Sequence, residues 1–461
     1  MTPARAGAIV WLRRDLRRAD LPTLAAAHAA SGGGPVAVVF VLDPRFYDDA
    51  GPARQAWLAA TLFVLRGSYD GRLCVRAGDP VTGIPALARE LGATSVHVSR
   101  ETEPAGAARD AAVREVLASE GVAWVETGSP YAVTPGRVLN RAGEGFQVFT
   151  PFSRAWCEHG WRAPAEEPAG LEVARVPSSE GLWGRLGAAL EQPGVPRLPP
   201  AGEDAALARW RGFLGDALDD YGSHRDRADL DATSRMSPYL KFGVVHPRTL
   251  LADLEARGGP SADRLRTELA WREFYADVLA RHPESLWHDL RPGLGAVSDW
   301  DDTGLVEAWR YGRTGYPFVD AGMRQLLTTG WMHNRVRMVV ASFLTKDLHT
   351  HWTLGARWFL EHLIDADLAS NNHGWQWVAG TGTDAAPYFR VFNPVLQGRR
   401  YDPEGDYVRR WVPELAHLAG PGVHEPWQVA GGYSHGYPGR IVDHAEERRI
   451  ALARFAEVSG R

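Results

Sequence analysis

The run VAVVFVL at residues 36–42 decides the fold of the first part of the chain. It is continuously apolar, without the polar alternation of a half-exposed strand. Similar short runs surround it at AIVWL (8–12), RLCVR (72–76), SVHVS (95–99) and VAWVE (122–126), with helical stretches between them. Strands of this kind are typical of a parallel sheet that helices bury on both faces. The pattern therefore predicts a doubly wound α/β domain.

Sheets of this kind bind ligands beyond the carboxyl ends of their strands. No GxGxxG or Walker sequence is present, however, and SGGGP (31–35) ends a helix and enters a strand, so it is a turn and not a phosphate loop. The α/β region alone therefore does not identify its ligand.

Beyond this region the chain changes character. Its 461 residues predict two or three domains. The segment from about 130 to 200 is rich in proline and glycine and ends in EQPGVPRLPPAG, which predicts an inter-domain connector. From residue 201 onward the pattern is helical and holds most of the 18 tryptophans. This enrichment exceeds what core filling requires.

Composition excludes several classes of function. Two cysteines without a CxxC pair, Cys74 and Cys157, support neither a disulfide framework nor a thiolate zinc site. The histidines lack HExxH spacing, so no metal site is expected. No signal peptide and no apolar run of about 18 residues is found, which predicts a cytoplasmic protein without a membrane segment. A net charge of −5 still permits one local basic groove.

The stretch LIDADLASNNHGWQWVAGTGTDAAPYFRVFN (363–393) combines acids, amides and indoles. Acids and amides are costly to bury without partners. The presence of Asp365, Asp367 and Asn371 beside Trp375 and Trp377 therefore indicates a polar ligand with a large flat ring. A surface loop anchored by tryptophan is the alternative.

A second stretch, DATSRMSPYLKFG (231–243), predicts a short helix with Ser237 as its N-cap and Pro238 as its first residue. Together with Thr233 and Ser234, the hydroxyls and free amides of such a helix start suit a phosphate or pyrophosphate. An ordinary capped helix is the alternative.

A third stretch, TELAWREFYADVL (267–279), places Glu268, Trp271, Arg272 and Tyr275 on one helix face. An acid, an indole, a guanidinium and a phenol on one face can form a stacking and hydrogen-bonding site. The alternative is a Glu268–Arg272 surface pair beside packed aromatic rings.

A fourth stretch, GWMHNRVRMVVASFLTKDL (330–348), predicts a helix with an apolar stripe that includes Val336, Val339 and Val340. Asn334, Arg337 and Met338 lie on a different face and are candidates for lining a pocket; a polar surface with one long arginine is the alternative.

Together these stretches resemble a known family. TSRMSPYLKFG, ELAWREFY, GYPFVDAGMRQLLTTGWMHNRVRM, ASFLTKDL and DADLASNNHGWQWVAGTGTDAAPYFRVFNP, with VWLRRDLRRAD (10–20), are similar to the DNA photolyase/cryptochrome family, most closely to class I cyclobutane pyrimidine dimer photolyases. The resemblance covers nearly the whole chain. It implies a Rossmann-like α/β domain for an antenna chromophore (1–130), a connector (131–200) and an all-α catalytic domain that binds FAD and DNA (201–461).

The implied activity is light-dependent DNA repair by a carbon–carbon lyase. Photoexcited reduced FAD donates an electron to a cyclobutane pyrimidine dimer and splits it into two pyrimidines. The dimer must first be flipped out, because the active site cannot reach it inside the duplex. A blue-light-sensing cryptochrome, a (6-4) photoproduct photolyase and a flavoprotein with thermal redox chemistry are the alternatives. The partner implied is UV-damaged DNA, bound by a monomer without a protein partner.

The resemblance also assigns roles to residues. The implied catalytic pocket consists of Glu268, Trp271, Asn334, Met338 and Trp377. The implied electron-transfer chain consists of Trp375, Trp352 and Trp300. The implied FAD contacts are Tyr221, Thr233, Ser234, Arg235, Met236, Ser237, Arg337, Asp365, Asp367 and Asn371. The implied DNA contacts are Arg225, Trp271, Arg335 and Gln397.

Two positions depart from the family pattern. His373 stands where many relatives have glycine, and it either alters the flavin site or faces away from it. RETEPAGAARD (100–110) is similar to the sequence of relatives with an 8-hydroxy-5-deazaflavin antenna, but lacks their tyrosine. A deazaflavin antenna is therefore favoured over methenyltetrahydrofolate, and a flavin antenna stays open.

Overall fold

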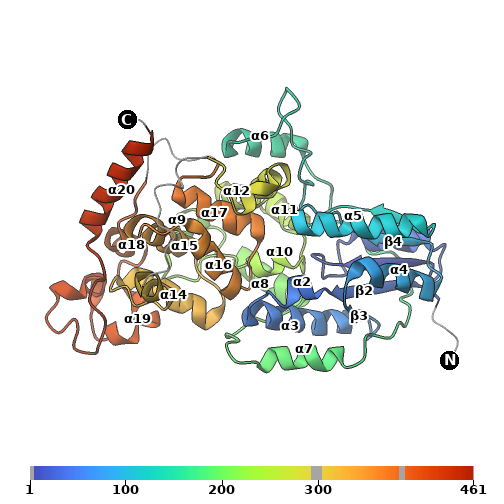
Figure 1. Ribbon diagram of the computed structural model, residues 1–461, viewed down its shortest axis with the longest axis horizontal. Coiled ribbons are helices and arrows are strands. Elements are labelled where there is room, and N and C mark those ends of the chain that lie inside the picture. The colour runs from blue at the N-terminus through green and yellow to red at the C-terminus, as the bar shows by residue number, and fades with distance from the viewer. Residues whose placement is uncertain (1–4, 292–303, 384–389, 460–461) are drawn as a thin grey trace. The chain divides into compact units, whose positions relative to one another are not determined.

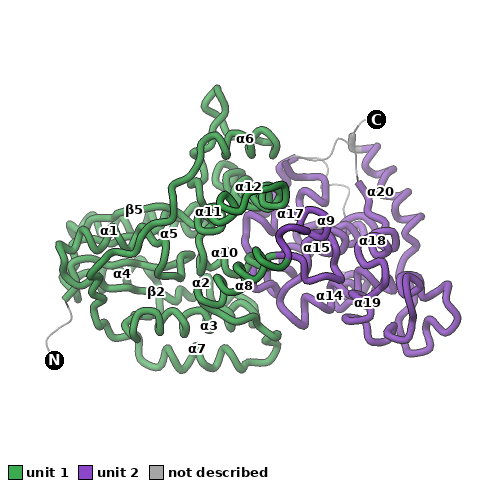
Figure 2. Tube along the Cα trace, turned by 180° about the vertical axis from the view of Figure 1, so that it is seen from behind, with its two compact units in different colours: residues 1–216, 234–283 green, residues 217–233, 284–461 purple. Residues whose placement is uncertain are grey.

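The computed structural model describes residues 5–291, 304–383 and 390–459 (Figure 1). The chain divides into two compact units (Figure 2). Unit 1 comprises residues 1–216 and 234–283, and unit 2 comprises residues 217–233 and 284–461. The limits of the three functional domains remain a prediction.

Unit 1 contains the predicted parallel sheet. Its strands are β1 (Ala8–Leu12), β2 (Val36–Leu42), β3 (Cys74–Ala77), β4 (Ser95–Val98) and β5 (Ala123–Glu126). They are all parallel, in the order β3-β2-β1-β4-β5. The prediction of a doubly wound sheet is confirmed. β3 begins two residues later than expected, because its ladder with β2 starts at the pair Val39 and Cys74.

Helices cover both faces of this sheet, as the continuously apolar strands require. Val10 of β1 packs in a core with α1 (Pro22–Ala30), α3 (Pro52–Ser68) and α7 (Leu182–Glu191). Its neighbour Trp11 packs on the opposite face with α4 (Pro80–Leu91) and α5 (Pro104–Ser119). The other helices of unit 1 are α2 (Pro44–Tyr47), α6 (Phe149–His159), α8 (Glu203–Asp216), α10 (Ser237–Lys241), α11 (Pro247–Arg257) and α12 (Pro260–Arg281).

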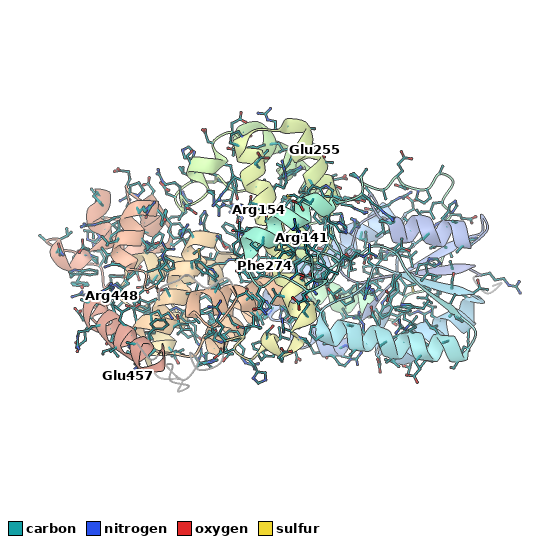
Figure 3. All side chains as sticks on the ribbon, turned by 90° about the horizontal axis from the view of Figure 1, so that it is seen from above. Arg141, Arg154, Glu255, Phe274, Arg448 and Glu457 are labelled. Carbon is teal, nitrogen blue, oxygen red and sulfur yellow. The ribbon has the colours of Figure 1, made fainter. Side chains whose placement is uncertain are left out.

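A buried carboxylate on α12 holds the irregular segment after β5. Glu273 accepts hydrogen bonds from the backbone N–H of Val133 (3.0 Å) and the indole N–H of Trp156 (2.6 Å). Burial nevertheless raises the pKa of Glu273 to about 7. The neighbouring Phe274 is buried, whereas Glu255 on α11 reaches the surface (Figure 3).

Unit 2 is helical. Its α-helices are α9 (Tyr221–His224), α13 (Gly304–Arg310), α14 (Pro317–Thr329), α15 (Asn334–Ser342), α16 (Trp352–His362), α17 (Leu368–Ala379), α18 (Pro394–Tyr401), α19 (Asp406–Trp411) and α20 (His444–Ser459). One aromatic-rich core joins α13 to α19, with Trp309, Trp352 and Trp375 buried in it. Within the described ranges, every helix is too short or too polar to cross a membrane.

The helix predicted over 330–348 does not continue uniformly. After α15 the chain forms a π-helical turn, η3 (Phe343–Asp347), which buries Lys346. The Lys346 ammonium donates to the carbonyl of Ala379 at the end of α17 (2.5 Å). Burial lowers the pKa of Lys346 well below its ordinary value. This turn thus links α15 to the helix that carries the acid, amide and indole cluster.

Candidate functional site

Asp365 is the most constrained of the predicted site residues. Its side chain is 1% exposed, and its Oδ2 accepts a hydrogen bond from Nη2 of Arg337 (2.8 Å). Its Oδ1 is also buried and has no hydrogen-bond partner within the described part of the chain. A buried acceptor without a partner costs about 1–3 kcal/mol. This oxygen is therefore suited to a donor from a bound molecule.

Asp367 has a different local task. Its side chain accepts a hydrogen bond from the backbone N–H of Ser370 (2.9 Å), so it is the N-cap of α17. The first turn of this helix carries Asn371, whose Nδ2 donates to the carbonyl of Ala356 (3.2 Å) and to Oδ1 of Asn372 (2.8 Å). Two contacts fix the orientation of the Asn371 amide before any ligand binds.

His373 turns toward the interior of unit 2. It is 1% exposed, and its ring nitrogens lie 2.8 Å from the carbonyl oxygen of Ala369 and 3.0 Å from Oγ of Ser285. The histidine therefore ties α17 to the segment after α12. This explains how a bulky side chain is accommodated at a position where glycine was expected.

Two of the three tryptophans assigned to electron transfer lie in the core of unit 2. The indole N–H of Trp352 donates to Oδ1 of Asp289 (2.7 Å). Trp375 meets Phe359 edge to face, with 5.0 Å between ring centroids. A Cβ at Gly355 would lie 2.1 Å from Cη2 of Trp375, so glycine is required there. The third, Trp300, lies outside the described residues.

α15 presents the two faces that its sequence predicts. Val336, Val339 and Val340 are buried in the unit 2 core. Arg337 and Met338 are half-buried, and Asn334 is exposed at the first position of the helix. Trp377 of α17 is also half-buried and packs against the same core, as does Met338. α15 is therefore anchored by its buried valines, while its other face remains partly accessible.

The predicted DNA contacts in unit 2 share a carboxylate that the sequence did not single out. Asp226 lies 2.8 Å from Nη2 of Arg335 and 3.8 Å from Nε of Arg225. Arg335 also lies over the ring of Tyr401, 4.7 Å from its centroid, and Arg225 lies over Tyr221 at 5.7 Å. These contacts hold both guanidinium groups in place.

Gln397, the remaining predicted DNA contact of unit 2, lies on α18. Its Oε1 is buried and lacks a hydrogen-bond partner among the residues that the structure describes. An amide oxygen in this state is a free acceptor.

Trp271 of α12, in unit 1, is held by a partner that sequence reasoning missed. Phe149 stacks on it face to face, with ring centroids 3.6 Å apart and planes 7° from parallel. Trp271 is half-buried, as is Glu268 one turn before it. Phe149 lies in the aromatic run VFTPFSRAW (148–156), but its stacking partner could not be deduced from the sequence.

Arg272 contacts neighbouring segments of unit 1. Its guanidinium donates to the carbonyls of Pro130 (3.1 Å) and Leu240 (3.2 Å) and lies 4.5 Å from the centroid of the Tyr131 ring. It therefore fastens α12 to two neighbouring segments.

The expectation for Ser237 as N-cap was wrong by one residue. Met236 is the N-cap of α10 and makes no side-chain cap, while Ser237 is the first helical residue. Arg235 before it has φ +54°, a left-handed conformation that arginine seldom adopts. Ser234–Ser237 belong to unit 1, whereas Tyr221 and Thr233 belong to unit 2.

Comparison with known proteins supports one family along the whole chain. Residues 8–169 match the family described as DNA photolyase, and residues 265–457 match the FAD binding domain of DNA photolyase. The deoxyribodipyrimidine photo-lyase of Vibrio cholerae is 38% identical over 98% of this chain and 100% of its own length. That of Streptomyces griseus is 41% identical over 98% of this chain and 99% of its own length.

Solved structures agree. The class III photolyase from Agrobacterium tumefaciens has a TM-score of 0.91 at 37% identity, over 99% of this chain and 98% of its own. The Synechocystis cryptochrome has a TM-score of 0.86 at 28% identity, over 98% of this chain and 99% of its own. The chain therefore belongs to the DNA photolyase/cryptochrome family.

Proposed function

We propose that this protein is a deoxyribodipyrimidine photo-lyase, an enzyme that uses light to split cyclobutane pyrimidine dimers in DNA into two pyrimidines. The observation that carries the proposal is the end-to-end similarity to relatives of that name, which reaches 38% to 41% identity over 98% of the chain. Light sensing alone and repair of (6-4) photoproducts are not favoured by these relatives.

The residues of unit 2 fit FAD as the cofactor. The buried Oδ1 of Asp365 is an acceptor without a donor among the described residues. The ion pair with Arg337 holds the Asp365 carboxylate in place. Arg337, Asp365, Asp367 and Asn371 would hold the cofactor together with Tyr221, Thr233 and Ser234–Ser237. Reduced FAD, when bound and excited by light, supplies the electron that splits the dimer.

The pocket residues would receive the flipped-out dimer. Trp271 and Trp377 offer flat faces, and stacking on such faces contributes about 1–3 kcal/mol per base. Glu268 would form a hydrogen bond with a pyrimidine carbonyl where negative charge develops. Asn334 and Met338 would complete the pocket from α15.

Two further sets of residues serve this reaction. Trp375, Trp352 and Trp300 would pass electrons inward to regenerate the reduced cofactor, because indole is readily oxidised. Arg225 and Arg335 would hold DNA phosphates, and Gln397 would add a hydrogen bond. The contacts of Asp226 with both arginines support a preorganised pair of phosphate contacts.

We also propose a photolyase class and a light-harvesting antenna chromophore for this protein. The motif resemblance supports class I, although the Agrobacterium structure belongs to class III. We favour 8-hydroxy-5-deazaflavin over methenyltetrahydrofolate, bound where the sheet order reverses between β1 and β4. Extracting the pigment from the purified protein and measuring its absorption spectrum tests the choice. The protein would act as a monomer.

A repair assay tests the function. Anaerobically reduced protein would be mixed with oligothymidylate that carries cyclobutane dimers, and the thymine absorbance band followed under near-UV light and in the dark. The proposal predicts recovery only in light, strongly reduced in Glu268→Ala and partly retained in Glu268→Gln, which keeps a hydrogen-bond donor. Light-independent recovery, or none from protein that holds reduced FAD, would refute it.

A further inference from the structure

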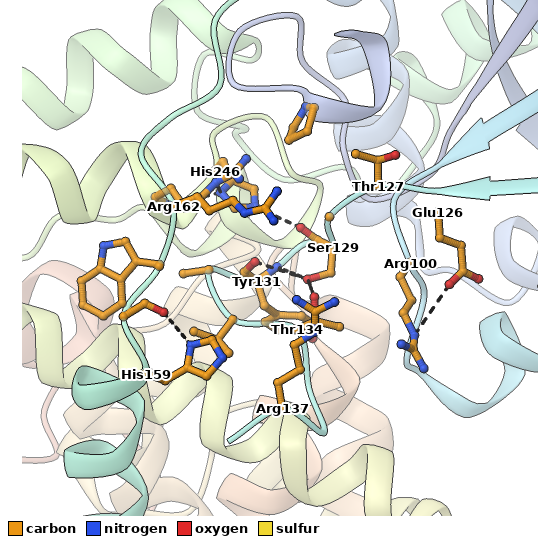
Figure 4. Close-up of a pocket in the computed structure, with 17 residues that line it drawn as sticks. Arg100, Glu126, Thr127, Ser129, Tyr131, Thr134, Arg137, His159, Arg162 and His246 are labelled. Carbon is orange, nitrogen blue, oxygen red and sulfur yellow. Dashed lines mark hydrogen bonds and ion pairs between the residues drawn. The ribbon is translucent and has the colours of Figure 1, made fainter. Parts of the chain in front are cut away.

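Unit 1 contains a pocket that the repair reaction does not use. It has a volume of about 580 Å³ and lies beyond the carboxyl ends of β4 and β5, where Arg100 and Glu126–Thr134 form one part of its wall. The end of α6 with the residues that follow it (His159–Arg162), the start of α11, Pro22 and Arg137 also line it. This volume is in the range of small-molecule sites. Figure 4 shows Arg162 and His246 on one side of the pocket and Arg137 on the other, with Ser129 and Tyr131 between them.

The charge of the pocket is strongly one-sided. Its lining contains four arginines, Arg100, Arg137, Arg162 and Arg248, and a single carboxylate, Glu126. Glu126 lies 3.9 Å from Nε of Arg100. The guanidinium groups of Arg137 and Arg162 form no hydrogen bond or ion pair with any other described residue. Their positive charge is thus available to an anion.

The floor of the pocket consists of buried side chains that hydrogen bonds hold in place. Arg248 is 7% exposed; its Nη2 donates to Oδ1 of Asp20 (2.5 Å) and its Nε to Nδ1 of His246 (3.1 Å). Its Nη1 has no partner in the described part of the chain. His246 in turn donates from Nε2 to the carbonyl of Ser129 (3.0 Å). One nitrogen of a fixed, buried arginine therefore remains uncommitted at the pocket.

Like charges face one another across this floor. Burial lowers the pKa of Arg248, and the charge of Arg162 lowers it further. Burial and the arginines nearby also lower the pKa of His246 well below its ordinary value, so the imidazole is neutral. Asp20 compensates Arg248 only in part. A bound anion would relieve the remaining repulsion.

One wall of the pocket is flat and aromatic. Trp161 is half-buried and lies against Trp156, with 4.5 Å between ring centroids. Trp156 is itself fixed by its hydrogen bond to Glu273 (2.6 Å). The indole of Trp161 therefore has a rigid support on one face, which suits it for stacking on a planar ring.

We propose that this pocket binds a nucleotide-type molecule, a small anion with a phosphate group and a flat ring. Arg137, Arg162 and Arg248 take the phosphate, and Trp161 takes the ring. The size of the pocket and the buried Arg248 favour a small molecule over a DNA strand, whose backbone carries only one charge per nucleotide. The inference does not depend on the repair activity.

Isothermal titration calorimetry of the FAD-loaded full chain tests this. The probes are ADP, dTDP, inorganic phosphate, adenosine and an undamaged oligothymidylate. We expect saturable binding of at least one of the two diphosphates, and at least tenfold weaker binding of inorganic phosphate and adenosine. The double variant Arg137→Ala, Arg162→Ala should weaken the diphosphate at least tenfold. Arg114→Ala, an exposed arginine of α5 outside the pocket, should change it less than twofold.

Three outcomes would overturn the proposal. The first is failure of both diphosphates to bind. The second is equal binding by wild type and double variant. The third is an oligothymidylate that binds as tightly as the diphosphates and loses affinity equally in the double variant, because that would assign the arginines to a DNA backbone. Unchanged FAD content in the double variant shows that each result refers to folded protein.

Discussion

Asp365 shows how a single residue couples folding to cofactor binding. Its carboxylate is buried, one oxygen is paired with Arg337, and the other has no partner among the described residues. Breaking a buried ion pair by removing one partner is costly because the remaining charge is left uncompensated. The stability of this part of unit 2 and its capacity for FAD are therefore expected to change together.

Arg337→Ala should lower both quantities. We expect a loss of about 3 kcal/mol in the free energy of unfolding, since Asp365 would remain buried and unpaired, together with a marked drop in FAD content after purification. Denaturant unfolding and the flavin absorbance band measure the two effects. The matched control is Arg448→Ala, which changes an exposed arginine of α20 (Figure 3). An Arg337→Ala protein with full FAD content would contradict the role assigned to the pair.

The stack of Phe149 on Trp271 leads to a second residue-scale prediction. Phe149→Ala removes the support of the indole, and aromatic stacking contributes about 0.5–1.5 kcal/mol beyond area burial. Affinity for dimer-containing DNA should fall about threefold to tenfold, with little change for undamaged DNA. Fluorescence anisotropy with the two oligonucleotides measures this. Leu139→Ala, an exposed residue of the same segment, should have no effect. Equal losses for both DNAs would argue against a role in recognising the lesion.

At the scale of elements, α12 is attached to the rest of unit 1 through Glu273. Its folded-state pKa of about 7 lies above the ordinary value of 4.5. The folded state therefore holds this proton more tightly than the unfolded state. The contribution of the Glu273 carboxyl to stability is complete below pH 4.5. It is lost as the pH rises toward 7, by about 1.4 kcal/mol for each unit by which folding raises the pKa.

Glu273→Gln removes this titration. Between pH 4.5 and 7, the free energy of unfolding of the wild type should fall by about 3 kcal/mol more than that of the variant. Urea denaturation at a series of pH values measures the difference. Parallel curves for the two proteins would show that folding does not raise the pKa of this carboxyl.

The elements also show what local sequence can and cannot reveal. The inner strands β1 and β2 were predictable because burial on both faces of the sheet leaves only apolar residues in them. The π-helical turn at Phe343–Asp347 was not, since its sequence also fits a regular helix and the partner of Lys346 lies 33 positions away. The cap of α10 was misplaced by one residue because Ser237 has the propensity of an N-cap without serving as one.

At the scale of the whole molecule, the sequence predicted the fold class and the candidate residues through long, ordered motifs. It could not supply the contacts that hold them. Asp226 between two arginines and Ser285 beside His373 are pairings that only the folded chain creates. Single residues of common type, such as these, have no pattern of their own in a sequence.

Net charge is another property of the whole molecule. With −5 overall, binding to DNA must rely on a few placed arginines. Each phosphate contact adds about 0.9 to the slope of log affinity against log salt for duplex DNA. Arg225→Ala and Arg335→Ala should each lower that slope by about 1, whereas Arg448→Ala should leave it unchanged. Slopes equal to that of the wild type would show that these two arginines do not contact phosphate.

The splitting of cyclobutane dimers by light is tested by a product balance. Reduced, FAD-loaded protein would be given two oligothymidylates, one with cyclobutane dimers and one with (6-4) photoproducts, under near-UV light and in darkness, with chromatographic measurement of lesions and restored thymines. We expect two thymines for each cyclobutane dimer lost, in light only, and no change in the (6-4) substrate. Loss of the (6-4) lesion instead, or intact dimers after illumination of fully loaded protein, would contradict it.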